Sequence, residues 1–275
     1  MKRLLIAVSL FISQQGLAEE FLVKYTDSRA LQSILFKAQQ KTATFLVQEI
    51  NETANLVKVE VPDRVRISGL LKLWAQPGVQ YVVPNFKLHS YLLRSSAYST
   101  PVHQTTLKEQ WAIGKVNAEK AWAKAGNKGN RKVLVAVIDT GADYKHESLA
   151  PNMVPGYDFK ENDNDPMDKT GFQNPGHGTH CAGAIGATGL IEGGIIGLAP
   201  EISLMPLRFL GEDGSGDLNA AIKAIDYAIE KGVHVISASW GATVPRSTAA
   251  PLLEAIKRAD DKGIIFVSAA ANDGA

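Results

Sequence analysis

Hydrophobic and polar positions in the first third of the chain form a pattern of short strands and one helix. Residues 21–25, 56–61 and 79–83 are short runs that alternate or stay apolar, as β-strands do. Residues 68–75 have helical character and end before Pro77-Gly78, a pair that stops a helix. The pattern between Glu20 and His89 predicts a small α+β unit.

The rest of the chain has a different pattern, in which predicted strands and helices alternate. Strands are predicted at residues 132–138, 203–209, 233–239 and 264–269, and helices at residues 179–187, 218–230 and 250–262. Gly232 and Gly263 stand where helix C-caps belong. Strands separated by helices of this length favour right-handed βαβ crossovers. We therefore expect an α/β fold, with a mostly parallel sheet and helices on both faces.

Two further segments divide the chain. Lys2-Arg3, the apolar run 4–12 and the small residues Gly16 and Ala18 are typical of a signal peptide cleaved after Ala18. Residues rich in Ser, Thr and Tyr without clear period follow the first unit and predict a linker. The expected organisation is a signal peptide at 1–18, a small domain at 19–90, a linker at 91–106 and a larger domain at 107–275.

Composition excludes several classes of function. The formal net charge of +1 offers no basic excess for nucleic acid. No apolar run reaches the ~20 residues of a membrane-spanning helix, so no membrane anchor is expected. The single cysteine, Cys181, has no partner within the chain and is interpreted as a buried thiol, with a reactive cysteine as the alternative.

Two residues are candidates for chemistry. Asp139 ends an apolar β-branched run, at the carboxyl end of a strand where open α/β sheets place functional groups. His177 stands between Gly176 and Gly178, before a stretch of small residues. Taken singly, such an Asp is usually a cap and such a His is usually structural. A metal site formed by His177 and His180 is a further alternative, although the spacing differs from the His-Glu-x-x-His of zinc proteases.

Five motifs together resemble the subtilases, the subtilisin-like serine proteases. These are Ile-Asp-Thr-Gly at Asp139, His-Gly-Thr-His at His177, Gly214-Ser215-Gly216, Ser239-Trp240-Gly241 and the Ala-Ala-Ala-Asn-Asp-Gly around Asn272. They occur in the family's order. The first unit resembles the family's inhibitory propeptide, and residues 110–122 resemble the start of its catalytic domain. The resemblance covers nearly everything after the signal peptide and implies a subtilisin-like sheet.

The resemblance implies acyl transfer. In the family, the histidine accepts the serine proton and returns it to the leaving amine, while the aspartate fixes the imidazole tautomer. The resemblance assigns these roles to Asp139 and His177. It assigns to Asn272 the role of donating a hydrogen bond to the oxyanion. It assigns substrate binding to two facing strands, formed by Ser239, Trp240 and Gly241 and by Gly214, Ser215 and Gly216. No cofactor is required for this chemistry.

One acidic loop is a candidate metal site. Carboxylates are gathered within one turn-rich segment, at Asp158, Asp163, Asp165 and Asp168. Such a segment suits Ca²⁺, which takes six to eight oxygen ligands. Some subtilases hold calcium in the loop before the histidine, so the resemblance supports a structural Ca²⁺. A solvated acidic loop is the equally weighted alternative.

The sequence departs from the family at the nucleophile. The family's serine lies in a Gly-Thr-Ser segment downstream of the oxyanion asparagine, and the 275 residues contain none. The favoured hypothesis is a fragment of a secreted or periplasmic serine endopeptidase precursor, a monomer that is inactive as written. Its partners would be protein or peptide substrates and its own propeptide. The alternative is a non-catalytic module that binds or inhibits another protease.

Overall fold

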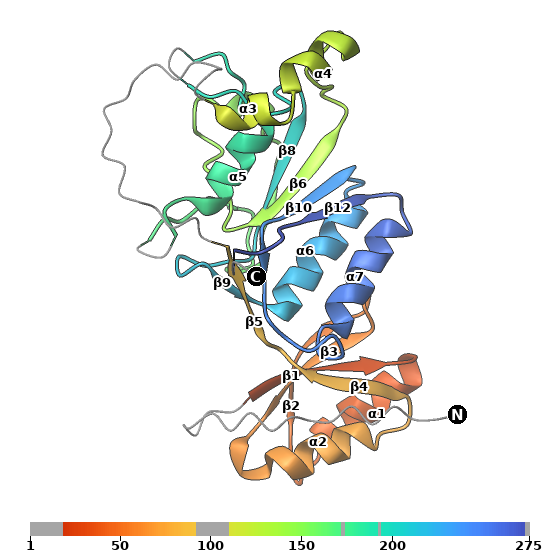
Figure 1. Ribbon diagram of the computed structural model, residues 1–275. Helices are drawn as coiled ribbons and strands as arrows, with labels where there is room; N and C mark the ends of the chain where they lie inside the picture. Colours follow the sequence, from red (N-terminus) through yellow and green to blue (C-terminus); the bar gives the residue numbers. More distant parts are fainter. Residues whose placement is uncertain (1–18, 92–109, 172–173, 192–193, 273–275) are drawn as a thin grey trace. The chain divides into compact units, whose positions relative to one another are not determined.

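The computed structural model describes residues 19–91, 110–171, 174–191 and 194–272 (Figure 1). The chain divides into two compact units, the first at residues 1–86 with 243–253 and the second at residues 87–242 with 254–275. The predicted signal peptide and all of the predicted linker except Tyr91 lie outside the described residues. No helix of the described part is long and apolar enough to cross a membrane.

The first unit contains a four-stranded antiparallel sheet with two helices. Its strands are β1 (Glu19–Tyr25), β2 (Leu46–Asn51), β3 (Leu56–Val61) and β4 (Val79–Pro84), in the order β2-β3-β1-β4. Its helices are α1 (Ser28–Ala38) and α2 (Arg66–Trp74), with the short 3-10 helix η1 (Asp63–Val65) before α2. The three predicted strands and the predicted helix are all present, whereas α1 and β2 were not predicted.

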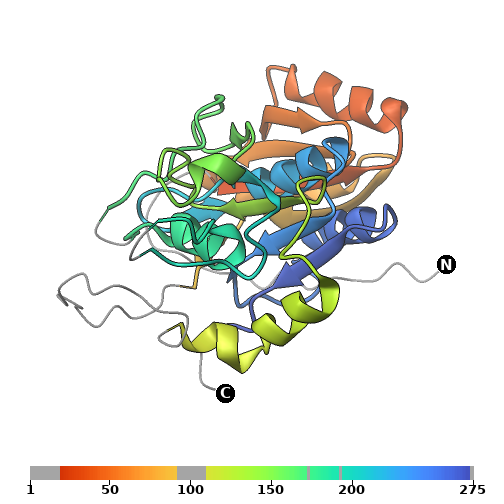
Figure 2. The same ribbon diagram turned by 90° about the horizontal axis from the view of Figure 1, so that it is seen from above.

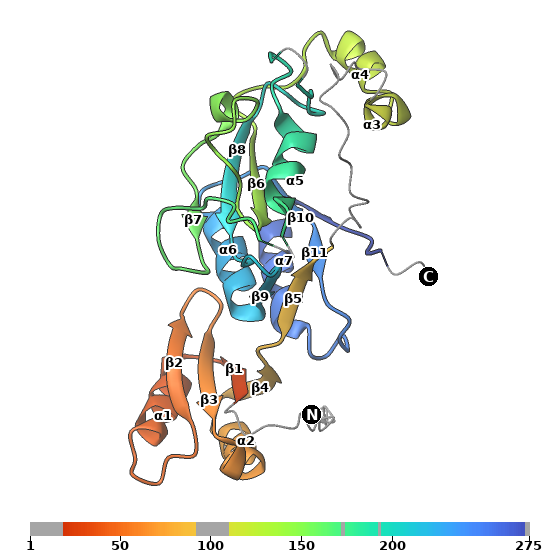
Figure 3. The ribbon, with the colours of Figure 1, turned by 90° about the vertical axis from the view of Figure 1, so that its left-hand side faces the viewer.

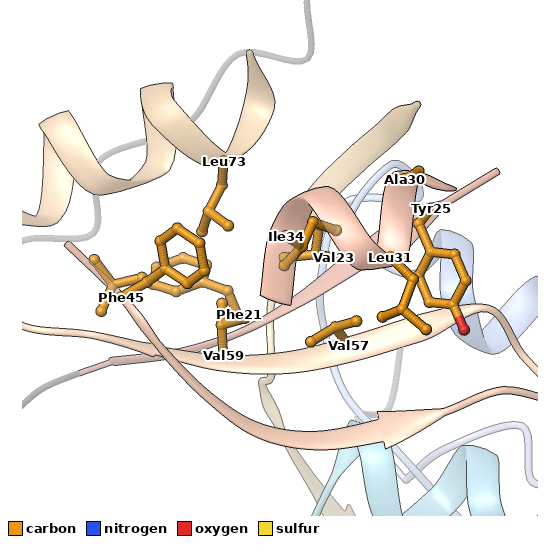
Figure 4. Close-up of a cluster of buried hydrophobic side chains, with 11 residues drawn as sticks. Phe21, Val23, Tyr25, Ala30, Leu31, Ile34, Phe45, Val57, Val59 and Leu73 are labelled. Carbon is orange, nitrogen blue, oxygen red and sulfur yellow. The ribbon is translucent and has the colours of Figure 1, made fainter. Parts of the chain in front are cut away.

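The core of the first unit is apolar. Alternate residues of β1 and β3 point toward the helices, and Ile34 of α1 and Leu73 of α2, both fully buried, close over them (Figure 4). Asp27 begins α1, because its carboxylate accepts hydrogen bonds from the backbone N–H groups of Arg29 and Ala30. The unit is thus built from hydrophobic alternation and one helix cap.

The second unit contains a five-stranded parallel sheet, in the order β12-β10-β6-β8-β7. Its strands are β6 (Leu134–Asp139), β7 (Tyr157–Asp158), β8 (Ser203–Arg208), β10 (Val235–Ala238) and β12 (Ile265–Ser268). Its helices are α3 (Trp111–Lys115), α4 (Ala118–Ala125), α5 (His177–Gly186), α6 (Leu218–Glu230) and most of α7 (Ala250–Asp260), from residue 254 on, with the 3-10 helix η2 (Ala150–Asn152). The predicted parallel α/β sheet is confirmed.

The helices of the second unit cover both faces of this sheet. Val135 and Val137 of β6 pack on one face against Ala182 of α5, while α6 lies on the other face (Figure 2). Gly232 and Gly263 both have positive φ, as their predicted positions at helix ends require. The carboxyl ends of the parallel strands meet at one edge of the sheet, and the motif residues follow those ends.

A second, three-stranded sheet lies in the same unit. It consists of β5 (Lys87–Ser90), β9 (Ser215–Asp217) and β11 (Trp240–Gly241), in the order β11-β5-β9, with all pairs antiparallel (Figure 3). The strand β5 was not predicted. Its four residues had been assigned to the small domain at 19–90, whereas the first compact unit reaches only to Phe86.

Candidate active site

Asp139 is held rigidly at the carboxyl end of β6. Its side chain is 1% exposed, and its carboxylate Oδ1 accepts the backbone N–H of Thr140 at 2.7 Å. Its carbonyl oxygen accepts the N–H groups of Phe209 and Leu210, which continue the neighbouring strand. Backbone bonds on both sides therefore leave this carboxylate little freedom to turn.

His177 is the first residue of α5, and the glycines beside it bring it close to Asp139. Gly176 has φ of 99°, a left-handed conformation that favours glycine. A Cβ atom at Gly178 would lie 2.0 Å from the carbonyl oxygen of Gly141. Only a residue without a side chain lets the helix start this close to the loop that follows β6.

Asp139 and His177 form a buried pair. The imidazole Nδ1 lies 2.7 Å from Asp139 Oδ1. An ionised carboxylate can only accept, so this contact assigns the proton to Nδ1 and leaves Nε2 free as a base. Burial by itself lowers the pKa of His177, but the hydrogen bond and charge of Asp139 raise it above its ordinary value. Burial raises the pKa of Asp139, against the lowering effect of His177.

Cys181 lies beside this pair but is unsuited to replace a serine. One ligand atom from each of Asp139, His177 and Cys181 lies within 4.8 Å of the others. Burial and the charge of Asp139 raise the pKa of the Cys181 thiol to about 12, despite a hydrogen bond with Ser239. The Cys181 thiol is therefore protonated at neutral pH. In this form it is a poor nucleophile and a poor metal ligand. His180 is exposed and does not belong to this group of three among the described residues.

The chain's own strand β5 lies between the two predicted substrate-binding strands and pairs with both. The register pairs Ser90 with Trp240, and His89 with both Gly241 and Ser215. Leu88 pairs with Gly216 and is 1% exposed. A peptide in extended form thus lies between β9 and β11 as a central strand, a mode of binding in which main-chain hydrogen bonds supply affinity.

All six residues predicted to bind substrate lie along this strand. Two of them accept its N–H groups directly, since Ser90 donates to the Gly214 carbonyl at 2.9 Å and Tyr91 donates to the Ser239 carbonyl at 3.2 Å. Trp240 contributes its backbone alone. Its ring is buried, donates from Nε1 to the Ile138 carbonyl at 2.7 Å and packs against Phe209.

This strand ends beside the pair formed by Asp139 and His177. The backbone of Tyr91 lies beside His177, and its carbonyl raises the pKa of this imidazole because it can accept a hydrogen bond from the protonated form. The Tyr91 ring packs against Gly241, where a Cβ atom would lie 2.2 Å from the phenol oxygen. The peptide group after Tyr91 is therefore the one that His177 can reach.

Asn272 lies at the expected edge of the sheet, without a hydrogen bond to the site. It follows β12 by four residues and is exposed. The Ala269 N–H donates to the Ala238 carbonyl at 3.2 Å, so the chain leaves β12 beside the segment that carries Ser239. Its role as an oxyanion donor stays a prediction.

The acidic loop does not form the predicted calcium site. Asp158 is fully buried and forms an ion pair with Arg208, and Asp168 accepts hydrogen bonds from Asn174 and Thr179. Asp163 and Asp165 instead accept backbone N–H groups of their own loop. The four carboxylates do not gather as a ligand set within the described part of the chain, and the arrangement does not fit a structural Ca²⁺.

Sequence reasoning missed two groups of site residues. Asn174 accepts the N–H groups of Gly176 and His177, a local contact that asparagine favours in turns before helices, so a local signal was present. Residues 87–91 carried no such signal, because their place depends on strands more than 100 residues away in sequence.

The comparisons with known proteins agree with this geometry. The model of the subtilase family matches residues 130–275, more than half of the chain. Thermitase of Thermoactinomyces vulgaris is 38% identical over 175 residues, which cover 64% of this chain and 59% of thermitase. The major intracellular serine protease of Bacillus subtilis is 42% identical over 160 residues, covering 58% of this chain and 48% of that protein.

Solved structures show the same fold. Fervidolysin from Fervidobacterium pennivorans, a keratinolytic enzyme related to subtilisin, superposes with a TM-score of 0.69 at 21% identity, covering 94% of this chain and 40% of fervidolysin. The chain spans roughly half the length of these relatives. The family match, the shared fold and the paired Asp139 and His177 lead to one conclusion: this chain belongs to the subtilase family.

Proposed function

We propose that this chain is part of the precursor of a secreted serine endopeptidase, in which residues 19–90 act as an inhibitory propeptide. One observation carries the proposal. The chain's own residues 87–91 pair with β9 and β11 as a peptide substrate would, with the Tyr91 backbone beside His177. A propeptide whose last strand fills the substrate groove blocks that groove until it is cut.

The chemistry follows from the catalytic pair. With Nδ1 bonded to Asp139, His177 Nε2 accepts the proton of an attacking hydroxyl and later gives it to the leaving amine. Asp139 holds the imidazole in the required tautomer and stabilises its protonated form. The nucleophile would be the serine of a Gly-Thr-Ser segment, which the 275 residues do not contain. As written, the chain should not hydrolyse peptides, and its own strand β5 should keep the substrate-binding strands occupied.

The bound strand also identifies the bond to be cut. We place processing at the peptide bond on the carbonyl side of Tyr91, the first residue of the predicted linker at 91–106. Gly241 leaves room for the Tyr91 ring, and Leu88 is buried three positions before it. The preferred peptides would therefore carry an aromatic residue before the cut and an aliphatic residue three positions earlier.

The proposed context is export. The predicted signal peptide directs the chain to the periplasm or the medium after cleavage near Ala18, and no spanning helix is present in the described part. The partners are peptide or protein substrates and the propeptide, and we propose a monomer. No cofactor takes part in the proposed reaction.

The test restores the missing nucleophile. The chain is joined to the C-terminal segment of a subtilase that carries Gly-Thr-Ser, and intact mass spectrometry follows processing. We expect a new N-terminus directly after Tyr91, no processing in His177→Ala, and retained processing in the matched control Tyr91→Phe. Residues 19–275 alone should stay intact in a host that lacks other proteases. A joined protein that folds and binds peptides but never cuts itself would support the non-catalytic protease-binding module instead.

A further inference from the structure

The helix that carries His177 has no capping residue of its own. α5 begins at His177, and its N-cap, Gly176, has no side chain. The first N–H groups of a helix have no partner within it and must be satisfied from elsewhere. The His180 N–H bonds the Gly176 carbonyl at 2.9 Å, which leaves the N–H groups of the first three helical residues.

Three side chains from outside the helix satisfy these donors one by one. Asn174 Oδ1 accepts the His177 N–H at 2.8 Å. Thr140 Oγ1 accepts the Gly178 N–H at 2.8 Å. Asp168 Oδ2 accepts the Thr179 N–H at 2.9 Å. The position of His177 against Asp139 therefore depends on a cap assembled from separate segments.

Asp168 links the start of the helix to Asn174. Its Oδ2 also accepts the Thr179 hydroxyl at 2.6 Å, and its Oδ1 accepts Asn174 Nδ2 at 2.8 Å. Asp168 is 7% exposed and Asn174 is fully buried, so these bonds are sheltered from water. Three neutral donors hold the carboxylate at the positive end of the α5 dipole.

The charge of Asp168 acts on the catalytic pair. The groups around His177 are the Asp139 carboxylate, the Asp168 carboxylate, the protonated Cys181 thiol and the Tyr91 backbone. Asp139 contributes most to the raised pKa of the imidazole, and Asp168 raises it further. A second negative charge thus favours the imidazolium that forms when His177 takes a proton.

We propose that Asp168, held in place by Asn174, is a positioning residue of the site that caps the His177 helix and stabilises the protonated imidazole. The proposal rests on the proposed function in one respect, that His177 is the catalytic base. It requires no nucleophile, so the chain can be tested as it exists, and its failure would leave the processing experiment untouched.

The test is an NMR titration of the chain labelled at its six histidines, with the His177 signal assigned by its loss in His177→Gln. Asp168→Asn removes the charge and keeps an oxygen acceptor. We expect the pKa of His177 to fall by about half a unit or more. The matched control Asp163→Asn removes an exposed charge from the same loop and should leave that pKa unchanged. Asp168→Glu keeps the charge, so the pKa of His177 in this variant should stay close to its value in the unaltered chain.

A second variant separates capping from charge. Asn174→Ala removes the cap on the His177 N–H and leaves the Asp168 charge in place, so the low-field proton signal of the Nδ1–Asp139 bond should broaden or disappear. An unchanged His177 titration in folded Asp168→Asn would overturn the electrostatic role. If that variant does not fold, an unchanged low-field signal in Asn174→Ala would overturn the proposal by itself.

Discussion

The two compact units bury different kinds of side chain. The core of the first unit is an apolar cluster in which Tyr25 carries the one polar atom. Every buried polar or charged residue of the described part lies in the second unit: Ser90, Asp139, Thr140, Ser148, Asn152, Asp158, Asp168, Asn174, Thr188, Arg208, Ser215 and Asn219. Burying a polar group costs free energy unless it is hydrogen-bonded. The first unit is thus specified by its hydrophobic pattern, whereas the second depends on bonded partners around its site.

Removing one partner of the buried ion pair should have the largest effect. Asp158→Ala leaves the Arg208 guanidinium buried without its carboxylate, and we expect a loss of about 3–5 kcal/mol in the free energy of unfolding of the second unit. The measurement is the urea midpoint of β8 amide signals in NMR spectra. The control is Glu161→Gln, which alters a half-exposed group 3.6 Å from Arg208 and should cost less than about 1 kcal/mol. Equal effects of the two variants would contradict this account.

A cavity in the first unit should come next. Leu73 is fully buried, so Leu73→Ala should cost about 3 kcal/mol, from lost burial and the space left behind. Each unit has its own core. The urea midpoint of the β1 amide signals should therefore fall, while the urea midpoint of the β6 amide signals stays constant. The matched control is Leu71→Ala on the same helix, where the side chain is 66% exposed. A shared fall in both units would show that their stabilities are linked.

The pH dependence of stability should have opposite signs in the two units. In the first, the Ala30 N–H and other donors lower the pKa of Asp27, so its contribution is present above its ordinary pKa and lost as the pH falls through the lowered value. In the second, the raised pKa of His177 gives a contribution that is complete below about pH 6.5 and lost as the pH rises through the raised value. The measurement is the urea midpoint of the β1 and β6 amide signals in NMR spectra, taken at pH values from acid to above neutral. The β1 midpoints report the contribution of Asp27, and the β6 midpoints report that of His177. The step near neutral pH should vanish in His177→Gln, and its persistence there would assign it to another group.

Calcium should have the smallest effect. Asp158 and Asp168 are already bonded to protein groups, and a ligand stabilises a protein only if it binds the folded state. We expect the melting temperature in millimolar calcium and in chelator to differ by less than about 1 °C. A rise of several degrees that Asp163→Asn abolishes would restore the calcium hypothesis for this loop.

Much of the fold could be predicted from local pattern. The strand Leu56–Val61 and the helix Leu218–Glu230 have their predicted bounds, because alternation and helical period are properties of neighbouring residues. The helix α5 begins at His177, two residues before the predicted start, because Asn174, Thr140 and Asp168 satisfy its first donors from outside.

The sequence by itself determined the α/β class and pointed to the candidates Asp139 and His177, since these depend on local periodicity and short motifs. Tertiary structure alone decided the place of β5 and the bonding of the acidic loop. Four residues of mixed polarity become a strand only because β9 and β11 provide partners on both sides. Asp158 becomes one half of an ion pair only because folding brings Arg208, 50 residues later, to its side. Such contacts join segments far apart in the chain, and no local pattern contains them.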